Sequence, residues 1–450
     1  MSVLDPETLT TRSARLAAAL RAMRPHVQVL GLLADNGLDW IALDRAAQRS
    51  GVTLVPLPAF FTAAQLAHAV QASHMDSLFC HDASLAQSLG FSPAGLPDGM
   101  PWHRRSIARR NASPRGSKLT FTSGTTGAPK PVQLSTREQW QVAHSISDAL
   151  RPLRLRRHLC LLPLALLLEN VAGVYAAEIA GAHCCVPPLA EVGMQGASGF
   201  DAHACLAAIE RWEAQSVILL PQMLAALTSA LEAGARLPRS LRFAALGGAR
   251  TAGALLERAR RAGLPVYEGY GLTECGSVVT LNHPDAERPG SVGRPLAHAR
   301  VRIERGEIEV RRQSRWFPTG DLGRLDADGF LYVEGRRKNV LITSFGRNVS
   351  PEWPEAELVA QPAIAQAAVF GEARAQLRAV LVAASAALSD AALERQVDAA
   401  NARLPDYAQV RRWVRADAGF TSQNGLATAN GRPKREAIWQ TYGKRLDALL

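Results

Sequence analysis

The rhythm of hydrophobic and polar positions changes along this chain. In its first two-thirds, short apolar runs alternate with amphipathic stretches. The apolar runs predict strands at 27–32, 52–56, 216–220, 243–246 and 264–267. The amphipathic stretches predict helices, among them 40–49 and 252–262. Apolar strands between amphipathic helices are typical of largely parallel sheets covered on both faces. This region therefore predicts an α/β architecture.

Near residue 300 the pattern becomes a strict alternation of polar and apolar positions. Residues 301–304 and 307–310 predict exposed antiparallel strands. The remaining predicted elements are helices at 352–358 and 390–404 and strands at 364–370 and 379–383. We therefore predict a large α/β domain of mostly parallel sheets at 1–335, with a small antiparallel β-subdomain at about 285–335, and a small α+β domain at 336–450.

Composition fits a folded chain of more than one domain. The chain has 450 residues, 47% hydrophobic and 20% charged, with a formal net charge of +11. Arginine carries almost all of the positive charge, because lysine occurs only at positions 118, 130, 338, 434 and 444. No nucleic-acid motif accompanies this charge, so we predict no nucleic-acid partner.

Cysteines, histidines and the longest apolar run predict a soluble, cytoplasmic protein. The six cysteines show neither C-x-x-C pairs nor zinc spacing, and the histidines show no metal-binding spacing. We expect the cysteines to be small buried residues of a reduced protein. The apolar run at 159–168 is too short to cross a bilayer, so we expect no transmembrane segment.

One glycine- and hydroxyl-rich segment predicts a polyphosphate loop. Its residues are Thr122, Ser123, Gly124, Thr125, Thr126, Gly127, Ala128, Pro129 and Lys130. Glycines let backbone N–H groups approach an anion, while hydroxyls add donors and a lysine adds charge. The alternative is a plain turn between strands. The segment lacks the Gly-Lys-Ser/Thr ending of the common nucleotide loop.

Four further clusters carry candidate chemistry. Tyr270 and Gly271 precede Thr273 and Glu274, which pair a hydroxyl with a carboxylate suited to Mg²⁺. Asp321 ends a Thr-Gly-Asp turn and can accept the two hydroxyls of a ribose. The other two clusters are basic and lie at 335–351 and 430–435.

In this order and spacing the clusters resemble the adenylate-forming (AMP-binding) superfamily of acyl- and aryl-CoA synthetases, luciferases and peptide synthetase adenylation domains. The resemblance extends from about residue 30 to 435, and residues 162–169 and 420–426 are most similar to long-chain fatty acyl-CoA synthetases. It implies that ATP activates a carboxylic acid, which we expect to be fatty or otherwise apolar. An acyl-adenylate and pyrophosphate form, and a thiol then takes the acyl group.

The resemblance also implies a role for each matching residue. The loop from Thr122 to Lys130 would hold the β- and γ-phosphates. Thr273 would reach the α-phosphate or the acyl carbonyl, and Glu274 would bind Mg²⁺. The remaining nucleotide-binding residues would be Gly247, Gly248, Ala249, Tyr270 and Gly271 around the adenine, Asp321 and Arg336 at the ribose, and Lys338 at the hinge of a mobile C-terminal domain.

The chain departs from the family at two positions. The family's C-terminal lysine directly follows Asn-Gly, where this chain has Arg432. Lys434 is the nearby lysine and our favoured candidate for that role, with Arg432 as the alternative. Leu166 also stands where the long-chain branch usually has histidine, and the leucines around it suit either an acyl chain or core packing.

The acceptor of the acyl group stays open at this point. Coenzyme A is the expected thiol, and an acyl carrier protein is the alternative, because a basic surface suits both. A weakened nucleotide-binding regulatory relative is a third reading, prompted by Arg432. The sequence does not predict the oligomeric state.

Overall fold

A computed structural model describes residues 6–95, 99–106, 117–122, 130–195, 199–312, 314–344, 347–428 and 431–449. The chain divides into two compact units. The first comprises residues 1–218, 238–242 and 272–278, and the second comprises 219–237, 243–271 and 279–450. The boundary predicted near Lys338 falls inside the second unit and stays a prediction. None of the helices in the described ranges has the length and apolar character that crossing a membrane requires.

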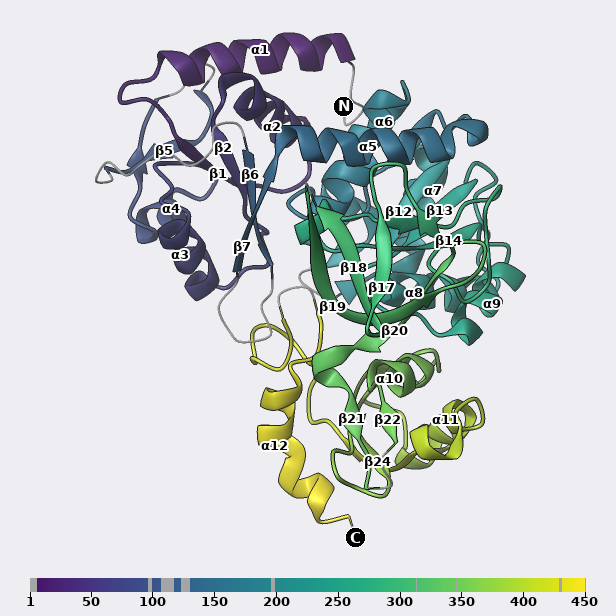
Figure 1. The fold of residues 1–450 in the computed structure, drawn as a ribbon. Coiled ribbons are helices and arrows are strands. Elements are labelled where there is room, and N and C mark those ends of the chain that lie inside the picture. The colour runs from purple at the N-terminus through teal and green to yellow at the C-terminus, as the bar shows by residue number, and fades with distance from the viewer. Residues whose placement is uncertain are drawn as a thin grey trace. The chain divides into compact units, whose positions relative to one another are not determined.

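The first unit alternates strands and helices along the chain (Figure 1). Its elements are α1 (Pro6–Ala22), β1 (Val29–Leu33), α2 (Leu38–Ser50), β2 (Thr53–Pro56), α3 (Ala63–Ala72), β3 (Ser77–Cys80), α4 (Ala83–Ser88), β4 (Ser92–Pro93), β5 (Trp102–Arg104), β6 (Ser117–Thr122), β7 (Lys130–Ser135), α5 (Thr136–Leu150), η2 (Arg151–Leu153), β8 (Arg157–Leu159), η3 (Glu169–Tyr175), α6 (Ala176–Ile179), β9 (His183–Cys185), η4 (Leu189–Val192), β10 (Met194–Gln195), β11 (Gly199–Phe200), α7 (Ala202–Arg211), β12 (Ser216–Leu219, whose last residue belongs to the second unit) and η5 (Thr273–Cys275).

Its main sheet has a parallel centre and antiparallel edges. The strand order is β4-β5-β3-β1-β2-β6-β7. β1 runs parallel to β2 and β3, and β2 runs parallel to β6, whereas β5 and β7 pair antiparallel with their neighbours. All five residues of β1 are buried, as expected for a strand covered on both faces. Elsewhere in this unit β8 runs parallel to β9 and β12.

The second unit carries the remaining elements. These are α8 (Pro221–Glu232), β13 (Phe243–Leu246), α9 (Gly253–Arg261), β14 (Val266–Tyr270), β15 (Thr280–Leu281), β16 (Arg294–Pro295), β17 (Val301–Glu304), β18 (Glu307–Arg312), β19 (Arg315–Leu325), β20 (Leu331–Arg336), η6 (Arg337–Asn339), β21 (Leu341–Ile342), β22 (Asn348–Val349), α10 (Glu352–Val359), β23 (Ile364–Phe370), β24 (Leu377–Ala383), α11 (Asp390–Asn401), η7 (Asp406–Ala408), β25 (Val410–Arg415) and α12 (Arg435–Asp447). β13 and β14 are parallel, and β17–β20 form the predicted antiparallel sheet.

The C-terminal part of the second unit is a three-stranded sheet with helices on both faces. Side chains alternate along β23, so that Ala367 and Val369 pack with α10 and α11, whereas Ala368 packs with α12. These contacts make two separate apolar clusters, one on each face of β23–β25. The predicted α/β fold, with a large N-terminal and a small C-terminal domain, is confirmed.

Candidate functional site

The ends of the predicted phosphate loop meet as a strand pair. Thr122 ends β6 and Lys130 begins β7, and the two are opposite each other in the antiparallel register. A hairpin therefore brings together the two points where the loop leaves and rejoins the sheet. Ser123, Gly124, Thr125, Thr126 and Gly127 lie outside the described residues, so their role stays a prediction.

Three predicted nucleotide-binding residues come together around one carboxylate. Asp321 is buried in β19, and its Oδ2 accepts a hydrogen bond of 2.7 Å from the Tyr270 hydroxyl. Its Oδ1 accepts a 2.8 Å hydrogen bond from Nε of Arg336, which is its register partner on β20. Both oxygens are thus held by donors from different strands, which fixes the orientation of the carboxylate.

A glycine bend follows β13 in the same unit. Gly248 has a φ of +90°, which glycine adopts without strain, and a Cβ there would lie 2.8 Å from Cδ2 of Leu220. A Cβ on Gly247 would lie 3.8 Å from the Gly269 carbonyl oxygen on β14. The bend therefore runs close beside the strand that ends in Tyr270.

A C-terminal hairpin reaches this bend through Arg432. The Arg432 guanidinium donates a 2.6 Å hydrogen bond from Nη2 to the Gly248 carbonyl oxygen. Two hydrogen bonds between Arg432 and Thr428, of 2.7 and 3.1 Å, close the hairpin. Lys434 lies just before α12, and its backbone N–H donates to the Leu426 carbonyl oxygen at 2.8 Å. Of the two candidate cations, Arg432 is the one whose side chain contacts the predicted adenine site.

Thr273 and Glu274 belong to the first unit, in the short helix η5. Both side chains are half-buried. A Cβ on Gly276 would lie 2.7 Å from Cγ2 of Val142, so η5 packs closely on α5. A half-buried carboxylate is a suitable donor for Mg²⁺, which prefers oxygen ligands, so Glu274 fits the predicted role.

Lys338 is exposed in η6, which connects β20 to β21. A side chain on the preceding Gly335 would collide with the Ser350 hydroxyl, so this connection passes very close to the segment before α10. Its role as a hinge stays a prediction.

The leucines at 164–168 divide between the core and the surface. Leu164 and Leu167 are 1% and 5% exposed, whereas Leu166 and Leu168 are partly exposed. Core packing is therefore the role of Leu164 and Leu167, two of these four leucines. Leu166 and Leu168 are the members that retain accessible apolar surface.

Sequence reasoning missed Glu268, which lies two residues before Tyr270 on β14. Burial raises the pKa of Glu268 to about 7, although Arg260 and Arg250 act in the opposite direction. A carboxyl group that titrates near neutral pH beside a candidate site is a functional candidate on physical grounds. Its sequence signal was weak, because an acidic residue at a strand end is ordinary.

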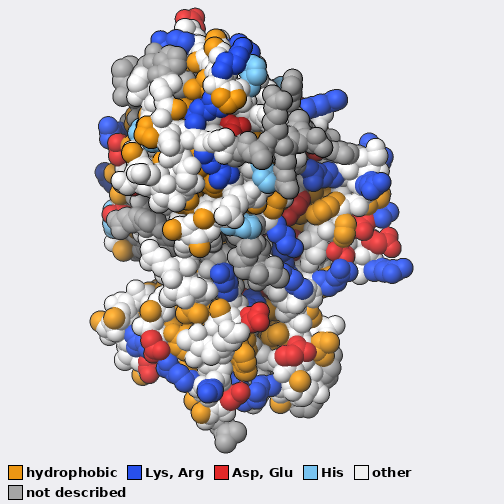
Figure 2. Space-filling view, turned by 90° about the vertical axis from the view of Figure 1, so that its left-hand side faces the viewer, with side chains coloured by type: hydrophobic (Ala, Val, Ile, Leu, Met, Phe, Trp, Pro, Cys, Tyr) orange, Lys and Arg blue, Asp and Glu red, His pale blue; other side chains and the backbone are white. Residues whose placement is uncertain are grey.

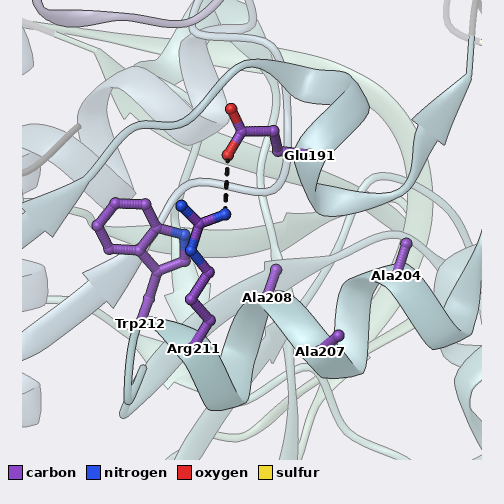
Figure 3. A pocket seen from close by; sticks show the side chains of 6 residues that line it. All are labelled: Glu191, Ala204, Ala207, Ala208, Arg211 and Trp212. Atoms are coloured by element: carbon purple, nitrogen blue, oxygen red, sulfur yellow. Dashed lines mark hydrogen bonds and ion pairs between the residues drawn. The ribbon is translucent and has the colours of Figure 1, made fainter. Parts of the chain in front are cut away.

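A surface hollow lies away from these residues, within the first unit. A pocket of about 260 Å³ is lined by Glu191, Ala204, Ala207, Ala208, Arg211 and Trp212 (Figure 3). The alanine face of α7 leaves the space, and the Arg211–Glu191 ion pair, at 3.4 Å, crosses one end. On the face drawn in Figure 2, basic side chains are interspersed with acidic and apolar ones.

Two sequence models of protein families match the chain. The model described as "AMP-binding enzyme" matches residues 7–314, and the one described as "AMP-binding enzyme C-terminal domain" matches residues 338–450. Together they account for most of the chain.

Individual relatives point in the same direction. A 2-succinylbenzoate–CoA ligase of Bacillus subtilis (strain 168) is 34% identical over 283 residues, which is 56% of this chain and 55% of that protein. The chain thus matches about half the length of that relative. Long-chain-fatty-acid–CoA ligase FadD15 of Mycobacterium bovis is 27% identical over 545 aligned positions, covering 96% of this chain and 90% of that protein. The solved o-succinylbenzoate–CoA synthetase (MenE) of Bacillus subtilis, in complex with its acyl-adenylate intermediate, has a TM-score of 0.75 at 26% identity, covering 96% and 92% of the two chains.

Proposed function

Because this chain belongs to the AMP-binding enzyme family, we propose that it is an acid–thiol ligase that works through an acyl-adenylate. A carboxylate oxygen attacks the α-phosphorus of ATP, and the bond to the bridging oxygen breaks as pyrophosphate leaves. A thiol sulfur then attacks the acyl carbonyl carbon, AMP leaves with the electron pair, and the thiol proton passes to solvent.

The observation that carries the proposal is the cluster of Tyr270, Asp321 and Arg336. Asp321 is a buried carboxylate with fixed orientation, and its oxygens can accept hydrogen bonds from the hydroxyls of a ribose. Tyr270 follows Gly269, whose carbonyl oxygen lies near the Gly247–Gly248 bend, and its aromatic ring offers a face on which a flat base can stack. This arrangement suits an adenosine.

The remaining residues would neutralise charge and align the reactants, which is most of what attack at an anionic phosphorus requires. Lys130 and the loop before it would hold the leaving pyrophosphate. Thr273 would donate to the α-phosphate or the acyl carbonyl. Glu274 would hold Mg²⁺, which when bound supplies positive charge at the phosphate oxygens.

The cation from the C-terminal part is a proposal of its own. The sequence favours Lys434, whereas the contact between Arg432 and Gly248 favours Arg432. We expect Arg432→Ala to lower ATP–pyrophosphate exchange by about 10²–10³-fold, as the loss of a charge-stabilising donor does. Lys434→Ala is the matched variant. If Lys434→Ala loses exchange and Arg432→Ala keeps it, the assignment to Arg432 is wrong.

The substrate is proposed to be a fatty or other apolar carboxylic acid. The partly exposed Leu166 and Leu168 offer apolar surface just before η3. The named activities of the relatives are on a long-chain fatty acid and on 2-succinylbenzoate, so the first of them supports this choice and the second makes an aryl acid the other candidate.

One experiment tests both the activity and the acid. Pyrophosphate exchange would be measured over fatty acids of different length, aryl acids including 2-succinylbenzoate, and amino acids, with Asp321→Asn as the control for ribose binding. Exchange with an apolar acid, together with a raised KM for ATP in Asp321→Asn, is the expected result. ATP binding without exchange for any acid would instead indicate a regulatory relative.

The acceptor thiol needs a second assay. We propose coenzyme A, and an acyl carrier protein is the other candidate. Thioester formation would be measured with each acceptor at equal concentration after the acid has been found. Product with the carrier protein alone would overturn the proposal of coenzyme A.

A further inference from the structure

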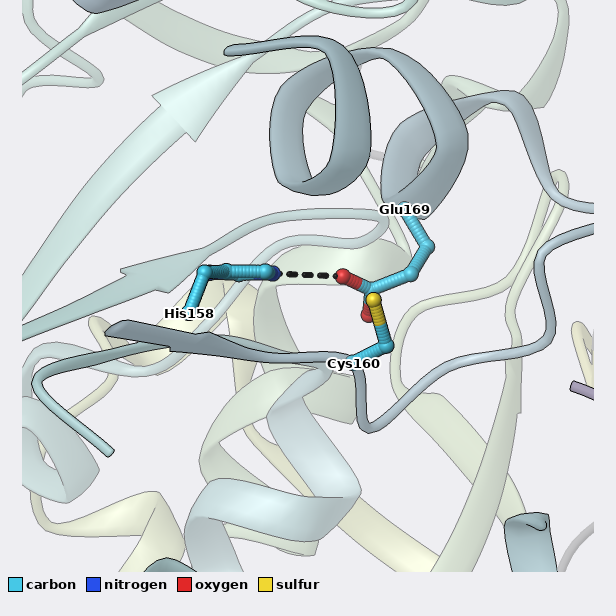
Figure 4. Close-up of side chains that lie close together, drawn as sticks. All are labelled: His158, Cys160 and Glu169. Carbon is cyan, nitrogen blue, oxygen red and sulfur yellow. Dashed lines mark hydrogen bonds and ion pairs between the residues drawn. The ribbon is translucent and has the colours of Figure 1, made fainter. Parts of the chain in front are cut away.

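Three side chains that the proposed reaction does not use converge in the core of the first unit. His158 lies on β8, Cys160 follows that strand, and Glu169 begins η3. Their ligand atoms all lie within 4.8 Å of one another, and all three residues are buried. Figure 4 shows His158 and Cys160 approaching from the strand and Glu169 from the helical segment above it. Nitrogen, sulfur and oxygen donors thus meet at one point.

His158 and Glu169 are each held in place by the polar atom that points away from the cluster. His158 Nδ1 lies 3.0 Å from the Ser216 hydroxyl, and Glu169 Oε2 accepts a 2.8 Å hydrogen bond from the backbone N–H of Leu162. This leaves His158 Nε2 and Glu169 Oε1 facing each other at 2.9 Å. Outer contacts that orient a ring and a carboxylate in this way are characteristic of metal ligands.

The surrounding backbone is shaped around these donors. η3 is a π-helix, a conformation that is rare and often found at functional sites. A Cβ on Gly173 would collide with Glu169 Oε1 and lie 2.6 Å from His158 Nε2, so only glycine lets the two donors lie against the helix here. The sulfur of Cys184, on the neighbouring strand β9, lies 3.6 Å from the sulfur of Cys160. Cys184 therefore borders the cluster, although it does not belong to the group of ligand atoms that lie within 4.8 Å of one another.

We propose that His158, Cys160 and Glu169 bind a zinc ion. Zinc accepts nitrogen from histidine, sulfur from cysteine and oxygen from glutamate as ligands. Neutral imidazole, one thiolate and one carboxylate balance the charge of Zn²⁺, which suits a buried location. The Cys160 thiol proton leaves to solvent as the sulfur–zinc bond forms. Ligands at tetrahedral zinc are about 3.3 Å apart, so His158 and Glu169 need to separate by only a few tenths of an ångström.

Metal content tests the proposal directly. The full chain would be produced with added zinc, dialysed exhaustively and analysed by inductively coupled plasma mass spectrometry. We expect about one zinc per chain, and less than about a tenth of that in Cys160→Ser and Glu169→Gln. Cys205→Ala is the matched control, because Cys205 is an equally buried thiol outside the cluster. Wild-type protein without zinc, or Cys160→Ser with its zinc retained, overturns the proposal.

A second measurement covers the case in which a variant does not fold. Cobalt added to metal-free wild-type protein is expected to produce a thiolate-to-cobalt absorption band, which needs no substitution. A chelator is expected to lower the melting temperature of the wild type, because a bound ion stabilises the folded state by mass action. If both the absorption band and the shift in melting temperature are absent, the zinc proposal is wrong, and His158 and Glu169 form a plain buried hydrogen-bonded pair.

Discussion

A buried ion pair between α2 and β6 gives the sharpest test of how the first unit is stabilised. Lys118 Nζ lies 2.9 Å from Asp44 Oδ1, and the two side chains are 3% and 0% exposed. Lys118 Nζ also lies 2.9 Å from the Tyr175 hydroxyl. Burial alone would raise the pKa of Asp44, but Lys118 and Arg45 hold it below its usual value. Asp44 is therefore ionised in the folded protein.

The structure sets the size of the effect. Removing one partner leaves the other charge buried without its nearest opposite charge, which costs about 3–5 kcal/mol of unfolding free energy. We expect Lys118→Met and Asp44→Asn each to lose an amount in that range. The double variant leaves no uncompensated partner of this pair, so we expect it to lose much less than the sum of the two single variants.

Urea unfolding followed by tryptophan fluorescence measures these values. Trp40 is a suitable reporter, because its ring centre lies 5.7 Å from Lys118 Nζ. Since the folded pKa of Asp44 is lowered, its stabilising contribution is present above the unfolded value of about 3.9 and is lost as the pH falls through the folded value. The cost of Asp44→Asn should therefore shrink below about pH 4. Single-variant losses under about 1 kcal/mol, or a double variant equal to their sum, would refute this reasoning.

Three further predictions concern other parts of the chain. Glu268→Gln should raise the free energy of unfolding by about 1–3 kcal/mol at pH 8, seen as a higher melting temperature, and should not raise it at pH 4. The reason is that the raised pKa of folded Glu268 costs stability as the pH rises from about 4.3 to 7. Gly173→Ala should cost about 1–3 kcal/mol in urea unfolding through its clash with the buried donors, whereas Gly253→Ala, in open space at the start of α9, should gain up to about 1 kcal/mol. Arg435→Met should lower the thermal stability of the C-terminal part by about 2–3 kcal/mol, because Arg435 Nη2 donates to Glu355 at 2.7 Å with little exposure; an unchanged melting temperature would contradict this.

The sequence predicted element positions best where one pattern dominated. β13 and β23 have the predicted bounds, because their apolar runs are short and flanked by clear breaks. α11 ends at Asn401, whereas the helix was predicted to continue to Leu404. Asn401 exchanges hydrogen bonds of 2.8 Å in both directions with the backbone of Val410, which ends the helix, and Leu404 packs in the core from outside it. Periodicity alone does not distinguish a buried leucine within a helix from one just beyond it.

For the candidate site, motifs identified residues but not their contacts. Asp321 and Tyr270 were predicted from their own segments, and they meet because β14 and β19 converge on one point in the second unit. The contact of Arg432 with Gly248 joins positions 184 residues apart, so no local pattern could show it. Motif order predicts which residues bind a common ligand, whereas the choice between two nearby cations depends on how a hairpin is placed.

The segment η3 shows most clearly what a hydrophobicity pattern leaves out. It follows an apolar run, and its polar residues suggest that the buried segment ends there. Glu169, Asn170 and Tyr175 are nevertheless all buried. Each one contacts a polar partner from another element: Glu169 contacts His158, Asn170 contacts Lys118, and Tyr175 donates to Asp44 at 2.5 Å. Burying three polar side chains in seven residues is tolerable only because each has such a partner. The partners come from α2, β6 and β8, so this one π-helix links the buried ion pair to the proposed zinc ligands, and a substitution in it should affect both clusters together.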